Sequence, residues 1–166
     1  MVGFRESAVD DAAAHALLSE YFESRAAGFP PQQGHYRATF PSPRDFVPPS
    51  GVFLIVEDVD LAGEPADVGC GGVRRIADGE SGRTRFEIKH LYLQPHLRGR
   101  GFGRRTLAEL EARAIALGAQ ELVLDTNAAL EAAGALYRSM GYEHIDPYNS
   151  NPNATDWYGK VVSTAG

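Results

Sequence analysis

LYLQPHLRGRGFGRR, residues 91–105, runs from an apolar segment into a turn rich in glycine and arginine that opens the next helix. Glycines let a backbone fold so that several N–H groups point at one place, and the first turn of a helix adds its positive end there. The arginines reinforce that field; they are Arg98, Arg100, Arg104 and Arg105. The stretch therefore predicts a turn that binds a phosphate ester largely through main-chain groups.

Two common phosphate loops do not fit this stretch. A dinucleotide-binding G-x-G-x-x-G that starts at Gly99 needs a third glycine where Arg104 stands. A Walker A loop ends in Gly-Lys-Ser/Thr, but the only lysines in the chain are Lys89 and Lys160. What remains is R-x-x-G-x-G, formed by Arg98, Gly101 and Gly103 between a strand and a helix.

Apolar periodicity predicts the elements on both sides of this turn. We expect a strand over 86–93, a helix over 102–117, a strand over 121–126, a helix from 129 to 140 and a strand over 142–145. Towards the N-terminus we expect a strand over 2–5, a helix over 10–26 and antiparallel strands over 52–57 and 68–76. A loop over 146–153 precedes a last strand over 156–162.

This pattern resembles the GNAT superfamily of N-acetyltransferases in two signatures. One is R-x-x-G-x-G, which in that family binds the pyrophosphate of acetyl-CoA, and the other is ALYRSMGY, residues 135–142, with a tyrosine four residues before Gly-Tyr. The resemblance covers essentially the whole chain. It implies one α/β domain over 1–166, with a mixed, mostly antiparallel central sheet flanked by helices and a splayed parallel strand pair that holds the coenzyme.

The resemblance also implies how the chain binds acetyl-CoA as co-substrate. The main chain of Leu91 and Leu93 would pair with the pantetheine arm like an added strand, and the Leu91 N–H would polarise the acetyl carbonyl. Many members carry an asparagine seven residues before the tyrosine, but this chain has Leu130 there, so Asn127 is expected to substitute. The expected coenzyme-binding residues are Leu91, Tyr92, Leu93, Arg98, Gly99, Arg100, Gly101, Phe102, Gly103, Arg104 and Asn127.

Acetyl transfer to an amine needs a base and an acid. A primary amine with a pKa of about 10 is almost wholly protonated at neutral pH, and a thiolate leaving group with a pKa of about 8.5 can take a proton from a phenol. By resemblance Glu87 is the base, usually acting through water, and Tyr137 is the acid. The alternative for Glu87 is an ordinary strand carboxylate paired with Lys89 or an arginine, and the alternative for Tyr137 is a buried aromatic residue of the helix over 129–140.

Composition limits the other functions. With 43% apolar residues in 166, the chain can bury a core as one domain. No apolar run reaches membrane-spanning length and no signal peptide is visible, so we expect a cytoplasmic protein with no membrane partner. Cys70 is the only cysteine and the five histidines lack ligand spacing, so no metal is expected. A formal charge of -6 argues against nucleic acid and suits a cationic acceptor.

Residues 28–51 hold six of the ten prolines together with Phe29, Tyr36, Phe40 and Phe46. Such a segment is either functional or a surface loop packed by its own aromatic side chains. As a wall of a pocket it would favour a small amine as acceptor. Two other functions stay open: a protein acetyltransferase for N-termini or lysines, and a non-catalytic acyl-CoA-binding module. A homodimer is common in the family.

Overall fold

The computed structural model describes residues 2–162. Its elements are β1 (Gly3–Glu6), α1 (Ala12–Ala27), β2 (Gly51–Val59), β3 (Pro65–Ile76), β4 (Arg85–Leu93), α2 (Phe102–Ala116), β5 (Glu121–Thr126), α3 (Glu131–Ser139), β6 (Glu143–His144) and β7 (Asp156–Val161). Short 3-10 helices are η1 (Pro31–Gln33), η2 (Pro43–Phe46) and η3 (Pro95–Leu97). No helix within residues 2–162 combines the length and apolar character needed to cross a membrane.

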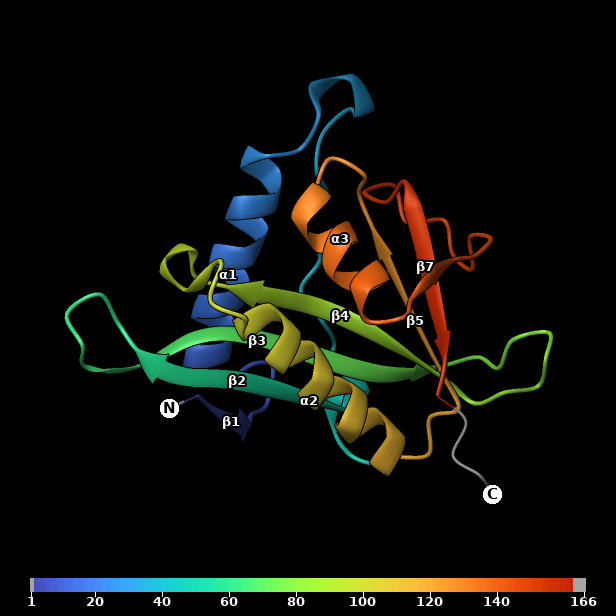
Figure 1. Ribbon diagram of the computed structural model, residues 1–166, viewed down its shortest axis with the longest axis horizontal. Helices are drawn as coiled ribbons and strands as arrows, with labels where there is room; N and C mark the ends of the chain where they lie inside the picture. Colours follow the sequence, from blue (N-terminus) through green and yellow to red (C-terminus); the bar gives the residue numbers. More distant parts are fainter. Residues whose placement is uncertain (1, 163–166) are drawn as a thin grey trace.

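One sheet contains all the described strands, in the order β1-β2-β3-β4-β5-β7-β6. Helix α1 lies on one face, while α2 and α3 lie on the other (Figure 1). Every neighbouring pair is antiparallel except β4 and β5, which run parallel. That pair is in register only from Arg85 with Glu121 to Glu87 with Val123, and beyond it the two strands part. The predicted mixed sheet with a splayed parallel pair is confirmed.

A β-bulge in β4 decides which side chains face which layer. The β3–β4 register shifts between Cys70 and Gly72, opposite His90, whose φ of 59° is the only positive value of a non-glycine residue in the described part of the chain. Ile88 before the bulge and Leu91 after it both pack in the core beneath α2. Tyr92 packs instead against the cluster of α1. Because the bulge adds one residue to β4, the side chains of Ile88 and Leu91 face the same side of the sheet although they are three positions apart.

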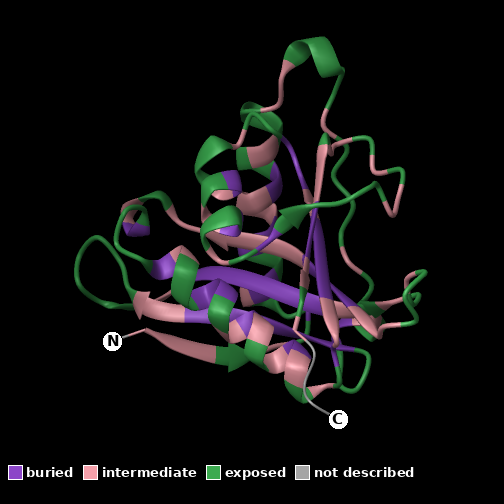
Figure 2. Ribbon diagram, turned by 45° about the vertical axis from the view of Figure 1, so that its right-hand side comes forward, coloured by how far each residue is buried: buried purple, intermediate pink, exposed green. Residues whose placement is uncertain are grey.

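Apolar side chains fill both sides of the sheet. Leu107, Leu110 and Ala114 of α2 pack on one face, and the α1 cluster on the other contains Leu17 and Leu18. The central strands are accordingly the most buried part of the fold (Figure 2). In β2 the residues from 51 to 56 are all buried, as expected of a central strand covered on both faces.

The elements differ from the expectations mainly at their ends. The strand expected over 142–145 is only Glu143–His144, because the Tyr142 N–H donates to the Tyr137 carbonyl at the end of α3 and its ring enters the core. Strand β3 begins at Pro65, three residues early. The proline-rich segment is irregular and partly 3-10 helical, as expected.

Candidate functional site

The turn before α2 has the backbone that the glycines predicted. Gly99 and Gly101 have φ values of 75° and 80°, a conformation that costs a residue with a Cβ free energy. No atom lies within 4 Å of where either Cβ would stand. These glycines are therefore needed for backbone conformation, not for space.

The same turn presents a cluster of unpaired donors. In the described chain the main-chain N–H groups of residues 99–104 donate to no other group. No side chain caps the N-terminus of α2, whose N-cap residue is Gly101. Arg104 leans across to donate a 2.9 Å hydrogen bond to Ser139 Oγ. Free N–H groups at the positive end of a helix are the arrangement that binds a phosphate group.

Two predicted members of the loop also have packing roles. The Phe102 ring is 5% exposed in the core, so only its main chain is available to a ligand. The guanidinium groups of Arg100 and Arg105 lie 5.1 and 5.2 Å from the centre of this ring. A Cβ on Gly103 would lie 3.3 Å from a methyl group of Leu136, so this glycine allows α2 and α3 to approach closely.

The parting of β4 and β5 leaves one backbone edge of β4 without a strand partner after Glu87. The side chains of Leu91 and Leu93 point into the apolar clusters, while the Tyr92 hydroxyl donates to Glu20 at 3.2 Å. The main-chain edge of β4 beyond Glu87 is thus not paired with a strand on this side. The geometry fits an extended chain added beside β4.

Tyr137 lies where this gap narrows. Its ring is 7% exposed and lines a small cavity of about 30 Å³ together with Leu91, Leu124 and Arg25. Burial raises the pKa of Tyr137 to about 12, although the nearby Arg25 acts in the opposite direction. The phenol therefore stays protonated at neutral pH, the form needed to give a proton away.

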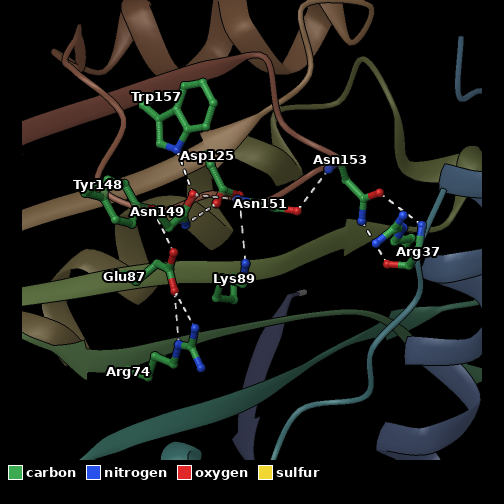
Figure 3. A network of polar contacts seen from close by, with 10 residues as sticks. All are labelled: Arg37, Arg74, Glu87, Lys89, Asp125, Tyr148, Asn149, Asn151, Asn153 and Trp157. Atoms are coloured by element: carbon green, nitrogen blue, oxygen red, sulfur yellow. Dashed lines mark hydrogen bonds and ion pairs between the residues drawn. The ribbon is translucent and has the colours of Figure 1, made fainter. Parts of the chain in front are cut away.

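Glu87 is fully enclosed, with 1% of its surface exposed. Its Oε1 accepts from Arg74 Nε at 3.0 Å and lies 2.9 Å from Arg74 Nη2, and its Oε2 accepts from the Tyr148 hydroxyl at 2.7 Å. Figure 3 shows the three side chains in line, with Glu87 between the other two. Its partner is thus an arginine, while Lys89 lies 3.8 Å from Asp125. Arg74 lines the main cavity and Glu87 does not.

The main cavity has a volume of about 400 Å³ and adjoins the gap. Aromatic rings form one wall, and they are Tyr21, Phe22, Phe29, Tyr36, Phe40 and Phe46. Polar groups from β3, β4, β5 and the loop before β7 also line the cavity. The segment over 28–51 therefore lines a pocket as well as packing on itself, since Phe29 contacts Tyr36. It also packs on α1, where Phe22 contacts both Tyr36 and Phe40. Among residues 2–162 no three potential metal ligands gather.

Asn127 lies in this cavity but is engaged locally. Its Nδ2 donates to Gln33 Oε1 at 2.7 Å and to the Asn153 carbonyl at 3.2 Å, and its Oδ1 accepts from the Ala129 N–H at 3.0 Å. These bonds brace the loop after β5. Asn127 would have to exchange one of them to contact a coenzyme.

One residue of the site, Asp125, was not expected from the sequence. Asp125, 7% exposed, lines both cavities and accepts a 2.7 Å hydrogen bond from Asn149. The Asn149 amide oxygen in turn accepts from Trp157 Nε1 at 2.9 Å. A carboxylate that ends a buried strand was a usable signal for Asp125. The contact of Tyr148 with Glu87 could not be predicted from local sequence, since the two residues are 61 positions apart.

The sequence comparisons agree with this geometry. The sequence pattern of the Acetyltransferase (GNAT) family matches residues 12–142, so the chain belongs to that family. An uncharacterized N-acetyltransferase of Schizosaccharomyces pombe is 32% identical over 109 residues, 66% of this chain and 62% of the relative. An IAA acetyltransferase of Azospirillum brasilense is 36% identical over 81 residues, 49% of this chain and 50% of the relative. The matches thus span between a half and two thirds of these relatives.

Solved structures share the fold over nearly the whole chain. An acyl-CoA N-acyltransferase structure from Klebsiella pneumoniae superposes with a TM-score of 0.68 and 27% identity, over 98% of each chain. A phosphinothricin acetyltransferase of Sinorhizobium meliloti, solved in complex with acetyl-CoA, has a TM-score of 0.62 and 19% identity, over 98% of this chain and 89% of that one. The predicted GNAT fold is therefore confirmed.

Proposed function

We propose that this protein transfers the acetyl group of acetyl-CoA directly to the primary amine of a small molecule. The observation that carries the proposal is the position of β4 between two features: its unpaired edge leads along the chain to the unpaired donors of residues 99–104, and its residues Lys89 and His90 line the cavity of about 400 Å³. Family membership supports the coenzyme, and the complex of the Sinorhizobium protein with acetyl-CoA supports it further.

In the proposed reaction, main-chain groups bind acetyl-CoA and Tyr137 acts as the acid. The N–H groups of 99–104 hold the pyrophosphate, and the Leu91 N–H donates to the acetyl carbonyl oxygen. Bound acetyl-CoA supplies the thioester, whose carbonyl carbon forms a bond to the amine nitrogen while its carbon–sulfur bond breaks. Tyr137 gives its proton to the departing sulfur. Direct transfer needs no covalent bond to the protein.

Glu87 accepts the proton lost by the amine in this proposal. Because both of its oxygens are already bound, that proton reaches it through water beside Arg74 or by exchange with Tyr148. Burial and the adjacent Glu87 raise the pKa of Tyr148 far above its usual range. Tyr148 therefore stays protonated and is not itself the base, but it can relay a proton by giving its own to Glu87 as it takes up another. The alternative role of Glu87 is structural, as the anion that holds Arg74 and Tyr148 together.

The cavity volume of about 400 Å³ and a contact between two of its lining residues support a small acceptor over a protein tail. Arg37 and Asn153 exchange two hydrogen bonds, N–H to Oδ1 at 2.9 Å and Nδ2 to carbonyl at 2.8 Å. They tie the aromatic segment to the loop before β7 (Figure 3). The expectations of one domain, a cytoplasmic location and a homodimer stay predictions.

A thiol-release assay tests the function. Acetyl-CoA would be offered with amino acids, polyamines, aminoglycosides and short peptides, with Tyr137→Phe as a variant of reduced turnover and a reaction without protein as the blank. We expect turnover with at least one small amine. Turnover confined to peptides would replace the small acceptor by a protein one, and coenzyme binding without turnover of any amine would favour a non-catalytic acyl-CoA-binding module.

A further inference from the structure

The main cavity is positively charged although the chain as a whole is negative. Four cationic side chains line it, Arg25, Arg37, Arg74 and Lys89, against two carboxylates, Asp45 and Asp125. The formal charge of the chain is -6. The cavity is therefore opposite in charge to the chain as a whole. A positive cavity favours an acceptor that carries a negative group, whereas the composition had suggested a cationic acceptor.

Two of the four cations are already neutralised. Arg74 contacts Glu87 at 2.9 Å and Asp45 at 3.5 Å. Lys89 lies 3.8 Å from Asp125. Together with Glu87, these groups account for every carboxylate that borders the cavity, so none is left for the other two arginines.

Arg25 and Arg37 have no carboxylate partner among residues 2–162. Arg25 is half-buried in the last turn of α1, where its guanidinium lies 5.3 Å from the centre of the Tyr21 ring. Arg37 is exposed, but the two hydrogen bonds that it exchanges with Asn153 fix its main chain at the cavity wall. Burying a guanidinium without an anion beside it costs free energy. A ligand that supplies the anion removes this cost and therefore binds more tightly.

The coenzyme phosphates are not that anion. Residues 98–104, where the pyrophosphate is placed, do not line the main cavity. Arg25 instead lines both this cavity and the narrow gap beside Tyr137 and Leu91. An anion bound to Arg25 would therefore lie close to the point where the acceptor amine meets the thioester.

We propose that the acceptor is an amino acid, whose carboxylate is held by Arg25 while Arg37 adds positive charge at the cavity wall. The inference rests on the proposed function and narrows its substrate class. A planar guanidinium matches a carboxylate with two parallel hydrogen bonds. The aromatic wall accommodates the apolar part of the acceptor. Polycationic amines are disfavoured by the same charges.

Matched acceptors test the carboxylate directly. Each of the twenty protein amino acids would be compared with its methyl ester, which keeps the amine and loses the charge, and spermidine would be included as a polycation. We expect kcat/KM to favour the acid of the best pair by roughly 10- to 100-fold, the range for a charge-assisted hydrogen bond. An ester amine is less basic, which favours the ester, so a preference for the acid does not arise from amine reactivity.

Variants locate the effect. Arg25→Gln should bring the acid-to-ester ratio close to one, and Arg37→Gln should lower it by a smaller factor. Arg44→Gln is the matched control, because Arg44 is exposed on η2 and does not line the cavity. A wild-type ratio near one, a preference for spermidine, or a ratio unchanged in Arg25→Gln would overturn the inference.

Calorimetry separates this inference from the function. Binding of N-acetyl amino acids, the expected products, would be compared with binding of their methyl esters to wild type and Arg25→Gln. Binding that depends on both the carboxylate and Arg25, without turnover, would uphold the carboxylate site and reject acetyl transfer. Turnover without a carboxylate preference would do the reverse.

Discussion

The Tyr148 hydroxyl donates a 2.7 Å hydrogen bond to Glu87, which joins the loop before β7 to the buried middle of β4. Arg74 on β3 occupies the other carboxylate oxygen. A carboxylate held from both sides can fix its neighbours in place or exchange a proton through them, and these two functions predict different behaviour as pH changes.

The phosphate-binding turn gives the first prediction. Gly101→Glu should abolish measurable acetyl-CoA binding, because it places a Cβ and a negative charge at a backbone with φ of 80° beside the pyrophosphate donors. The measurement is calorimetric titration with acetyl-CoA. Gly82→Glu is the matched control, since Gly82 has φ of 79° and equal free space but lies in the turn before β4.

The control separates strain from binding. Both variants should lose stability to a similar extent, whereas only Gly101→Glu should lose the coenzyme. Unchanged affinity in a folded Gly101→Glu protein would show that the pyrophosphate binds elsewhere.

Local sequence was sufficient to predict this turn, because consecutive residues determine both its backbone conformation and its hydrogen-bond donors. Glycine at 99 and 101 sets the backbone, and the helix that follows supplies the donors. The strand and helix order could likewise be predicted, since apolar periodicity reflects burial on one face or two. Element ends were less predictable because hydrogen bonds such as Tyr142 N–H to Tyr137 decide them.

The cavity could not be predicted in the same way, because its walls come from distant segments. Arg37 and Asn153 are 116 residues apart. Arg74 faces Glu87 only in the register that β3 and β4 adopt. The register of β3 against β4 cannot be predicted from either stretch of sequence alone, and the bulge at His90 shifts it by one residue.

A second prediction concerns Tyr137. Tyr137→Phe should lower kcat by roughly ten- to a thousandfold, an effect that extends into the lower part of the range for general acid catalysis, with little change in coenzyme affinity. Because burial raises the pKa of Tyr137 to about 12, the wild-type rate should show no loss from its ionisation up to about pH 10. Steady-state kinetics across pH measure both effects. A variant with wild-type turnover would remove Tyr137 from the mechanism.

The third prediction concerns stability in acid. Burial lowers the pKa of His90 to about 3, with Lys89 and Arg74 acting in the same direction, and its Nδ1 has no hydrogen-bond partner in the described chain. At a pH below about 6.5, the pKa of an unfolded histidine, His90 binds a proton in the unfolded chain but stays neutral in the folded protein. This residue therefore costs the wild type up to about 1.4 kcal/mol of stability for each pH unit between about 6.5 and 3.

His90→Asn removes that titration and keeps a residue that tolerates the left-handed backbone, where φ is 59°. Urea unfolding at pH 7 and pH 4.5 provides the comparison. The stability of the variant relative to wild type should rise as pH falls. A difference that stays constant between the two pH values would mean that folding leaves the pKa of His90 unchanged.

The last prediction decides the role of Glu87. If Glu87 accepts the amine proton, Glu87→Gln should depress kcat/KM most at neutral pH and recover partly as pH rises, because the free amine then loses its proton to solvent. Tyr148→Phe removes only the 2.7 Å hydrogen bond and should cost about 1 to 3 kcal/mol of stability, since it leaves a buried acceptor unsatisfied. If Glu87 instead only positions Arg74 and Tyr148, both variants should lower kcat/KM by a factor that is the same at every pH. The pH profiles of the two variants, measured beside wild type with one amine, distinguish the base from the structural anion.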